Sequence, residues 1–200
     1  MCSMLLTKTT KTQETIIRST IPILAREGYA GTSMRKVASS IDREPSIIYA
    51  HFAGKKSLLR ETRRYINRNL DEAQQYDDAL TAGQLLRASL EFQIKQREMI
   101  VALLQYFMAC PDDFSSVAGG GYVPDRAYQH MARIINKGIA EGVYYSDDVQ
   151  SDAKASTHLI NGYLVEYAQH RMNKSELDSV VSGLASYIER ALTCRPAGHR

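Results

Sequence analysis

Six side chains between residues 33 and 55 can each donate hydrogen bonds from the outer side of two short helical segments. They are Ser33, Arg35, Ser46, Tyr49, His51 and Lys55. The apolar residues between them recur at intervals of three and four, which predicts that they face a core. These are Met34, Val37, Ala38, Ile41, Ile48 and Phe52. Lys55 and Lys56 open a further helix, where cations oppose the helix dipole. This mild local penalty favours an anionic partner over a merely solvated helix start.

The charge distribution points the same way. Residues 1–70 contain 13 Lys and Arg against 5 Asp and Glu, a net charge of +8, whereas residues 71–200 contain 12 against 17, a net charge of −5. A basic front end on an acidic body predicts an anionic partner for the front end only. The alternative is chance clustering of charges on a solvated surface.

Several classes of chemistry are excluded by what the sequence lacks. It contains no GxSxG, HExxH, P-loop or dinucleotide-binding motif, so we expect no enzyme activity, no catalytic residues and no cofactor. Cys2, Cys110 and Cys194 form no CxxC pair, which argues against a zinc site and favours the reducing cytoplasm. No run of about 18 apolar residues could span a membrane.

The elements that position the six donors are predicted to be helices throughout. A first helix begins at the capping box Thr10–Gln13 and ends near Gly28, with a kink at Pro22. Helices are then expected over about 33–41, 45–52 and from Lys55 onward, over 81–110 with a split near "KQREM", and over 124–140, 148–172 and 175–194. The short connection between the last two predicts antiparallel neighbours. The fold class is therefore all-α.

Two short helices joined by a tight turn, "SMRKVASSIDREPSIIYAHF", have the proportions of a helix-turn-helix. Together with "GYAGTSMRKVA" and "SIIYAHFAGKKSLL", residues 10–60 resemble the DNA-binding domain of TetR-type transcriptional regulators. The resemblance implies a helix-turn-helix DNA-binding domain at residues 1–54 and a helical effector-binding and dimerisation domain at 55–200. It also implies a homodimer that reads a palindromic double-stranded operator with two recognition helices about 34 Å apart, and a repressor released by a small hydrophobic effector.

The resemblance assigns a role to each donor. Ser33 would bind a phosphate, and Arg35 a phosphate or a guanine edge. Ser46 and Ile47 would face bases, with a thymine methyl as the partner of Ile47. Tyr49 and His51 would flank the groove, and Lys55 would neutralise a phosphate.

The chain departs from the family's pattern at Asp42 and at Glu44-Pro45-Ser46. Asp42 is expected to cap backbone donors, whereas Glu44 either caps or accepts from a cytosine amino group. Pro45 suits a first helical turn. These departures favour one alternative function, a helical adaptor that has lost specific DNA binding.

Apolar residues of the second half predict an effector pocket. The candidates are Phe92, Met99, Leu103, Tyr106, Phe107, Met131, Ile134, His158 and Tyr163. Such a lining suits a lipid, drug-like or aromatic compound. The alternative is that these residues form plain core.

The last two helices each carry an apolar stripe that predicts a dimer interface. The candidates are Ile160, Leu164, Tyr167, Val180, Leu184, Tyr187 and Ile188. Two such helix pairs would form a four-helix bundle about a twofold axis. Alternatively, both stripes face the chain's own core.

Overall fold

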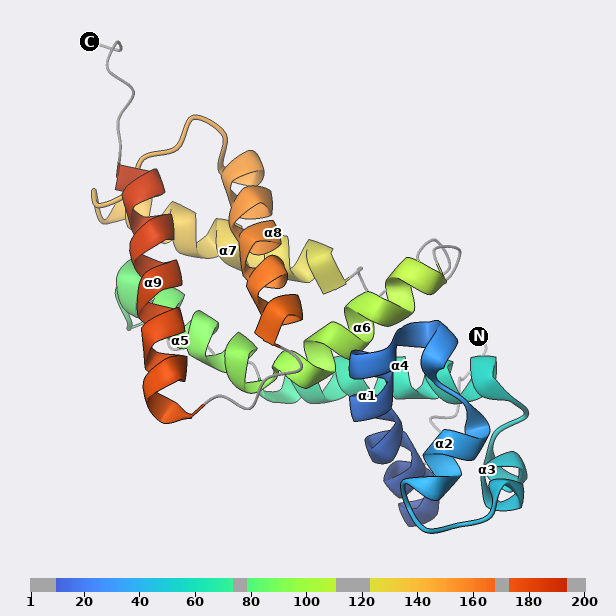
Figure 1. Cartoon of the computed structure of the whole chain (residues 1–200). Coiled ribbons are helices and arrows are strands. Elements are labelled where there is room, and N and C mark those ends of the chain that lie inside the picture. The colour runs from blue at the N-terminus through green and yellow to red at the C-terminus, as the bar shows by residue number, and fades with distance from the viewer. Residues whose placement is uncertain (1–9, 74–78, 111–122, 168–172, 194–200) are drawn as a thin grey trace, which may run out of the picture.

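The structure, a computed structural model, describes residues 10–73, 79–110, 123–167 and 173–193, and every regular element in these ranges is a helix (Figure 1). The helices are α1 (Lys11–Gly31), α2 (Met34–Ser39), α3 (Pro45–His51), α4 (Lys55–Ala73), α5 (Ala82–Lys95), α6 (Arg97–Ala109), α7 (Val123–Ala140), α8 (Val149–Tyr167) and α9 (Lys174–Thr193). The predicted all-α class is confirmed. None of these helices is long and apolar enough to cross a membrane.

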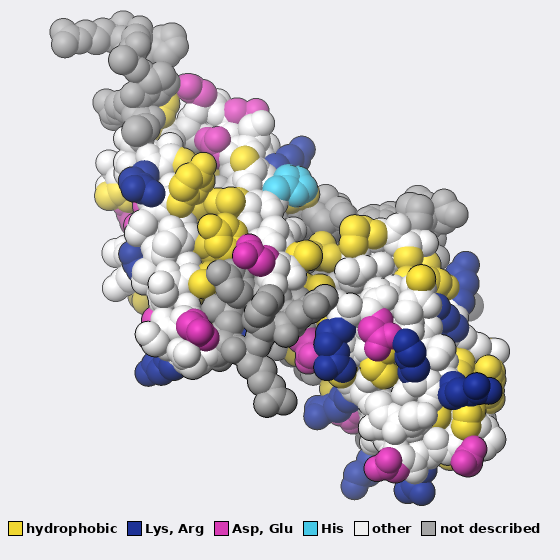
Figure 2. Space-filling view, in the orientation of Figure 1, with side chains coloured by type: hydrophobic (Ala, Val, Ile, Leu, Met, Phe, Trp, Pro, Cys, Tyr) yellow, Lys and Arg dark blue, Asp and Glu magenta, His cyan; other side chains and the backbone are white. Residues whose placement is uncertain are grey.

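Helices α1, α2 and α3 form a head at one end of the molecule, and α5, α7, α8 and α9 form a body at the other (Figure 1). One face of each head helix is buried and packs with α4 in the apolar core, which is continuous along the described part of the chain. At the head, its central side chains are Ile16, Leu24, Val37, Ile48 and Leu59, all at most 1% exposed. Lys and Arg side chains gather on the surface of the head (Figure 2).

The start of α1 and its break at Gly28 agree with the sequence, but the kink expected at Pro22 does not. Thr10 and Gln13 form the predicted capping box, with Gln13 N donating to Thr10 Oγ1 at 3.2 Å. The predicted kink at Pro22 is wrong, because the one residue of α1 with non-helical angles is Gly28, at φ 67°. Proline's fixed φ is itself helical, so Pro22 costs a backbone donor without breaking the helix. A positive φ instead requires a residue such as glycine.

The head rests on α6, which also contributes to the core of the body. Helix α1 packs along α6, and α4 contacts both α1 and α6. At Gly28 an added Cβ would lie 3.0 Å from Gln105 Oε1, so the α1 backbone approaches α6 closely here. The Arg63 guanidinium of α4 lies 5.8 Å from the centre of the Tyr106 ring of α6. A movement of α6 would therefore change its contacts with α1 and α4, the two helices that hold the head in place.

The body is built on α5, which contacts α6, α7 and α9, and on α7, which packs against α8. The expected split between α5 and α6 is confirmed at Gln96. The last two helices run in opposite directions, as predicted (Figure 1), although each packs mainly on other helices of the body. Helix α9 packs mainly on α5, and α8 on α7 and α6.

Candidate nucleic-acid interface

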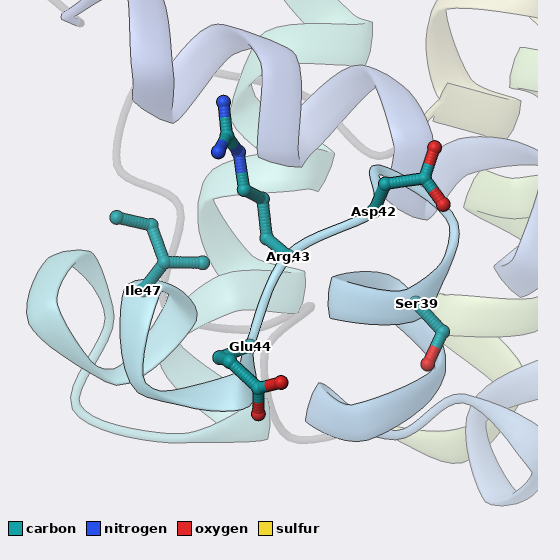
Figure 3. A pocket seen from close by; sticks show the side chains of 5 residues that line it. All are labelled: Ser39, Asp42, Arg43, Glu44 and Ile47. Carbon is teal, nitrogen blue, oxygen red and sulfur yellow. The ribbon is translucent and has the colours of Figure 1, made fainter.

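Helix α3 is surrounded by surface hollows that the head forms with polar and basic side chains. One hollow, of about 420 Å³, lies between the start of α2 and α3 and is lined by Ser33, Met34, Arg35, Pro45 and Tyr49. A second, of about 580 Å³, borders the α2–α3 turn and is lined by Ser39, Asp42, Arg43, Glu44 and Ile47 (Figure 3). A third, of about 460 Å³, is lined by Lys11, Thr12, Thr15, Ile41, Arg43 and Ile47. Six of the nine predicted DNA-contacting residues line these hollows, namely Ser33, Arg35, Glu44, Pro45, Ile47 and Tyr49.

Ser33 and Arg35 stand at the start of α2. The Ser33 hydroxyl oxygen accepts from the backbone N–H of Lys36 at 3.2 Å, so Ser33 is the N-cap of α2. Its own O–H is left to donate outward. Arg35 is exposed, while its neighbour Lys36 forms an ion pair with Glu27 of α1. Arg35 is consequently the cation of this helix that remains available to an external anion.

The turn between α2 and α3 is a Schellman motif. The N–H of Asp42 donates to Ser39 O at 3.2 Å, and the N–H of Arg43 donates to Ala38 O at 3.0 Å. Asp42 has φ 51°, the left-handed conformation that this motif places after a helix. The prediction that the Asp42 carboxylate caps backbone donors is therefore wrong in its mechanism. It is the backbone of Asp42 that caps the end of α2, and its side chain is exposed.

Helix α3 turns one residue inward and presents the others. Ile48 is fully buried, Ile47 is half-buried, and Tyr49 is 59% exposed. Pro45 occupies the first turn as predicted, and the N-cap Glu44 makes no side-chain capping bond, so its carboxylate faces outward. Ser46 is exposed as well. This helix presents donors and a partly exposed aliphatic group, which are the groups that read base edges.

Lys55, for which a phosphate contact is predicted, also has contacts within the chain. Its Nζ lies 4.4 Å from the centre of the Tyr29 ring and 3.4 Å from the carbonyl oxygen of Ala30. Partial burial lowers the pKa of Lys55, with an opposing contribution from Cys110. The cation at the start of α4 is thus stabilised by the end of α1. Lys56 is exposed, and His51 is half-buried.

The predicted effector residues divide between the interior and the surface of the body. Leu103, Tyr106, Phe107, Met131 and Ile134 are buried, and Phe92 and Met99 are partly buried. The other two, His158 and Tyr163, are exposed on α8. His158 pairs with Tyr128 at 3.2 Å, and Tyr163 is 38% exposed. Helical spacing alone did not tell which side of α8 is covered by α7.

One polar group in the body has no counterpart among the residues predicted from the sequence. His130 of α7 lies 3.1 Å from Ser89 Oγ of α5, and Gln93 Nε2 donates to the same oxygen at 3.2 Å. Ser89 is 1% exposed. No sequence motif predicts the contact of Ser89 and Gln93 with His130, because these residues meet only when α5 and α7 pack together.

The predicted dimer residues also divide. Ile160, Leu164, Leu184 and Ile188 are buried in the chain's own core, and Val180 is partly buried, whereas Tyr187 is 58% exposed. The side chain of Tyr167 lies outside the described residues. Exposed apolar residues that the prediction passed over lie beside them, namely Val165 at 44% and Tyr163. Hydrophobic side chains gather on the face formed by α8 and α9 (Figure 2).

Comparison with known proteins matches the head to a family. Residues 16–62 match the family model described as bacterial regulatory proteins, tetR family. No curated protein sequence matches the chain. Because the match begins in α1 and ends in α4, it contains the whole surface around α3.

Solved structures share the fold over nearly the whole chain. A putative transcriptional regulator from Saccharomonospora viridis, solved in complex with choline, has a TM-score of 0.73 at 22% identity and covers 92% of this chain and 99% of its own. A tetR-family regulatory protein from Rhodococcus RHA1 has a TM-score of 0.67 at 20% identity, covering 94% and 100%. A ketosteroid transcriptional regulator of Mycobacterium tuberculosis has a TM-score of 0.60 at 15% identity, covering 94% and 98%. The head thus contains the segment that matches the tetR family of bacterial regulatory proteins, and the chain as a whole shares its fold with solved regulators of that kind.

Proposed function

We propose that this protein is a ligand-responsive repressor, which binds a palindromic operator as a homodimer and leaves it when a small apolar effector binds the body. The single observation that carries the proposal is the surface around α3, where exposed Tyr49 lines one hollow with Arg35 and half-buried Ile47 lines another with Arg43. Donors and cations on a short helix suit the major groove. As a DNA-binding protein without catalytic activity, it would act in the cytoplasm.

The proposed contacts sort by chemistry. Ser33 and Arg35 bind phosphates at the start of α2, while Ser46, Ile47 and Tyr49 face base edges or flank the groove. His51 is a lateral contact, and Lys55 supports the head through Tyr29. Glu44 and Pro45 begin α3 as its N-cap and first-turn residue. In this proposal the Glu44 carboxylate accepts a hydrogen bond from a cytosine amino group. Residues 1–54 form the DNA-binding domain in this proposal, and 55–200 the effector-binding and dimerisation domain.

Homodimerisation is proposed through α8 and α9. Their buried stripe residues belong to the chain's own core, so the interface is formed by the exposed neighbours Tyr163, Val165 and Tyr187. Exposed apolar side chains that gather on one face favour an interface over a solvated surface. A twofold axis there would give each dimer two heads, one for each half of a palindrome.

The effector is proposed to bind beside α6. This helix carries Leu103, Tyr106 and Phe107 on its buried side, and the structural neighbour from Saccharomonospora viridis was solved with choline. Because α1 and α4 both contact α6, a ligand that favours one position of α6 would change the spacing of the two heads. Such a ligand must bind the released state more tightly than the DNA-bound state.

The test measures DNA binding of the purified full chain by fluorescence anisotropy with duplexes selected from a random pool. Tyr49→Ala should weaken binding while leaving the oligomeric state unchanged, and Tyr187→Ala should weaken dimerisation. Arg35→Gln should reduce the slope of log affinity against log salt by about 0.9 for each phosphate that the arginine no longer neutralises. A protein that binds no duplex even at low salt would be the alternative, a helical adaptor, to which the exposed carboxylates of Asp42 and Glu44 point.

A further inference from the structure

Arg43 holds a position in the α2–α3 turn that local rules reserve for an apolar side chain. The two hydrogen bonds of the Schellman motif make Arg43 the residue C″, which commonly packs against the last turn of the preceding helix through an apolar contact. Here the residue is an exposed arginine. Places where a sequence breaks a local rule are those where function is to be expected.

The Arg43 guanidinium has no partner among the described residues, although acidic residues flank it in sequence. Asp42 and Glu44 point to other sides of the turn, as Figure 3 shows. Two nearby cations are engaged, since Lys36 pairs with Glu27 and Lys55 lies over Tyr29, whereas Arg35 is available like Arg43. Arg43 is therefore held outward with its five N–H donors unused.

The position of Arg43 relative to α3 is fixed. Its backbone N–H is anchored to Ala38 O at 3.0 Å, and the next residue is the N-cap of α3. Its side chain borders the two hollows that also contain the half-buried Ile47. The N-terminal end of a recognition helix is the part that reaches base edges, so Arg43 and Ile47 are placed to meet adjacent bases.

We infer that Arg43 determines operator specificity by reading a guanine at the edge of each half-site, next to the base whose methyl group contacts Ile47. Arginine binds the O6 and N7 atoms of guanine with two parallel hydrogen bonds, which a lysine ammonium cannot reproduce. This inference rests on the proposed function, because it requires that α3 enter the major groove.

The experiment selects bound duplexes from a random double-stranded pool with the full-length wild type, Arg43→Lys and Arg43→Ala. Wild-type protein should select a motif with an invariant guanine at one position of each half-site. Replacing that guanine should weaken wild-type binding about 5- to 150-fold. Arg43→Lys should lose this preference while keeping the salt dependence, because the charge remains. The matched control is Arg26→Lys. Arg26 is an exposed arginine in the second half of α1, so its replacement should leave the selected DNA motif unchanged.

The outcomes separate the inference from the function on which it rests. Failure of the wild type to bind any duplex would overturn both. A wild type that selects a motif while Arg43→Lys selects the same guanine would overturn the inference alone. So would an Arg43→Ala variant that loses affinity equally for all sequences, since that is the behaviour of a phosphate contact. Circular dichroism and the oligomeric state of each variant report whether the head remains folded.

Discussion

His130 is expected to make the body sensitive to mild acid. It is largely buried between α5 and α7 and pairs with Ser89 Oγ, which already accepts from Gln93. Ser89 Oγ lies 3.1 Å from Nε2 of the imidazole. Burial, and then the nearby charge of Arg133, lower the pKa of His130 from its ordinary value of 6.5 to about 4.

The direction of the effect follows from proton binding. Between these two pKa values the unfolded chain binds a proton at His130 that the folded chain does not, so stability is present above pH 6.5 and is lost as the pH falls toward 4. The full contribution is about 3 kcal/mol, because each unit of pKa difference corresponds to about 1.4 kcal/mol. Between about pH 7 and pH 5, about 2 kcal/mol of it should disappear.

The assay is urea unfolding at these two pH values for the wild type and for His130→Gln, which keeps a hydrogen-bonding group but does not titrate. The variant should lose about 2 kcal/mol less stability than the wild type on acidification. His158→Gln serves as a control, because this exposed histidine should leave the wild-type pH dependence intact. Equal losses in the wild type and His130→Gln would refute the buried, neutral state of His130.

Four further substitutions have clear expectations. Gly138→Ala would place a Cβ 2.0 Å from the buried Tyr144 ring. Thermal unfolding should therefore show a loss of about 1–3 kcal/mol in the free energy of unfolding. An unchanged midpoint would contradict this packing. Lys55→Gln should lower the free energy of unfolding by about 0.5–2 kcal/mol, because it removes the contact with the Tyr29 ring. The exposed Lys56→Gln should alter only the salt dependence of DNA binding. Equal stability of the two variants would show that the contact between Lys55 and Tyr29 does not stabilise the fold. Asp42→Asn removes a negative charge, and asparagine also adopts the left-handed conformation of this turn. DNA affinity measured by anisotropy should therefore rise, while the free energy of unfolding changes by no more than about 0.5 kcal/mol. An unchanged affinity would place Asp42 away from DNA.

The sequence alone determined the helices and the head. Short-range signals suffice there, because the capping boxes at Thr10 and Thr81 and the apolar spacing around Ile48 act within one or two turns. The head is also small, so its inward and outward positions follow from a single periodicity. That is why Ser33, Arg35, Ser46 and Tyr49 could be assigned to one surface from their spacing.

Only the tertiary structure decided how surfaces and partners are distributed in the rest of the chain. Helices α8 and α9 are apolar on more than one side, so periodicity could not tell whether α7 or solvent faces Tyr163, nor that Ile160 and Leu184 belong to the chain's own core. The contacts of long side chains could not be predicted either, since Lys55 contacts the ring of Tyr29, which lies 26 positions earlier in the sequence. Contacts between distant segments depend on which helices meet, and that choice is made by the packing of the whole chain.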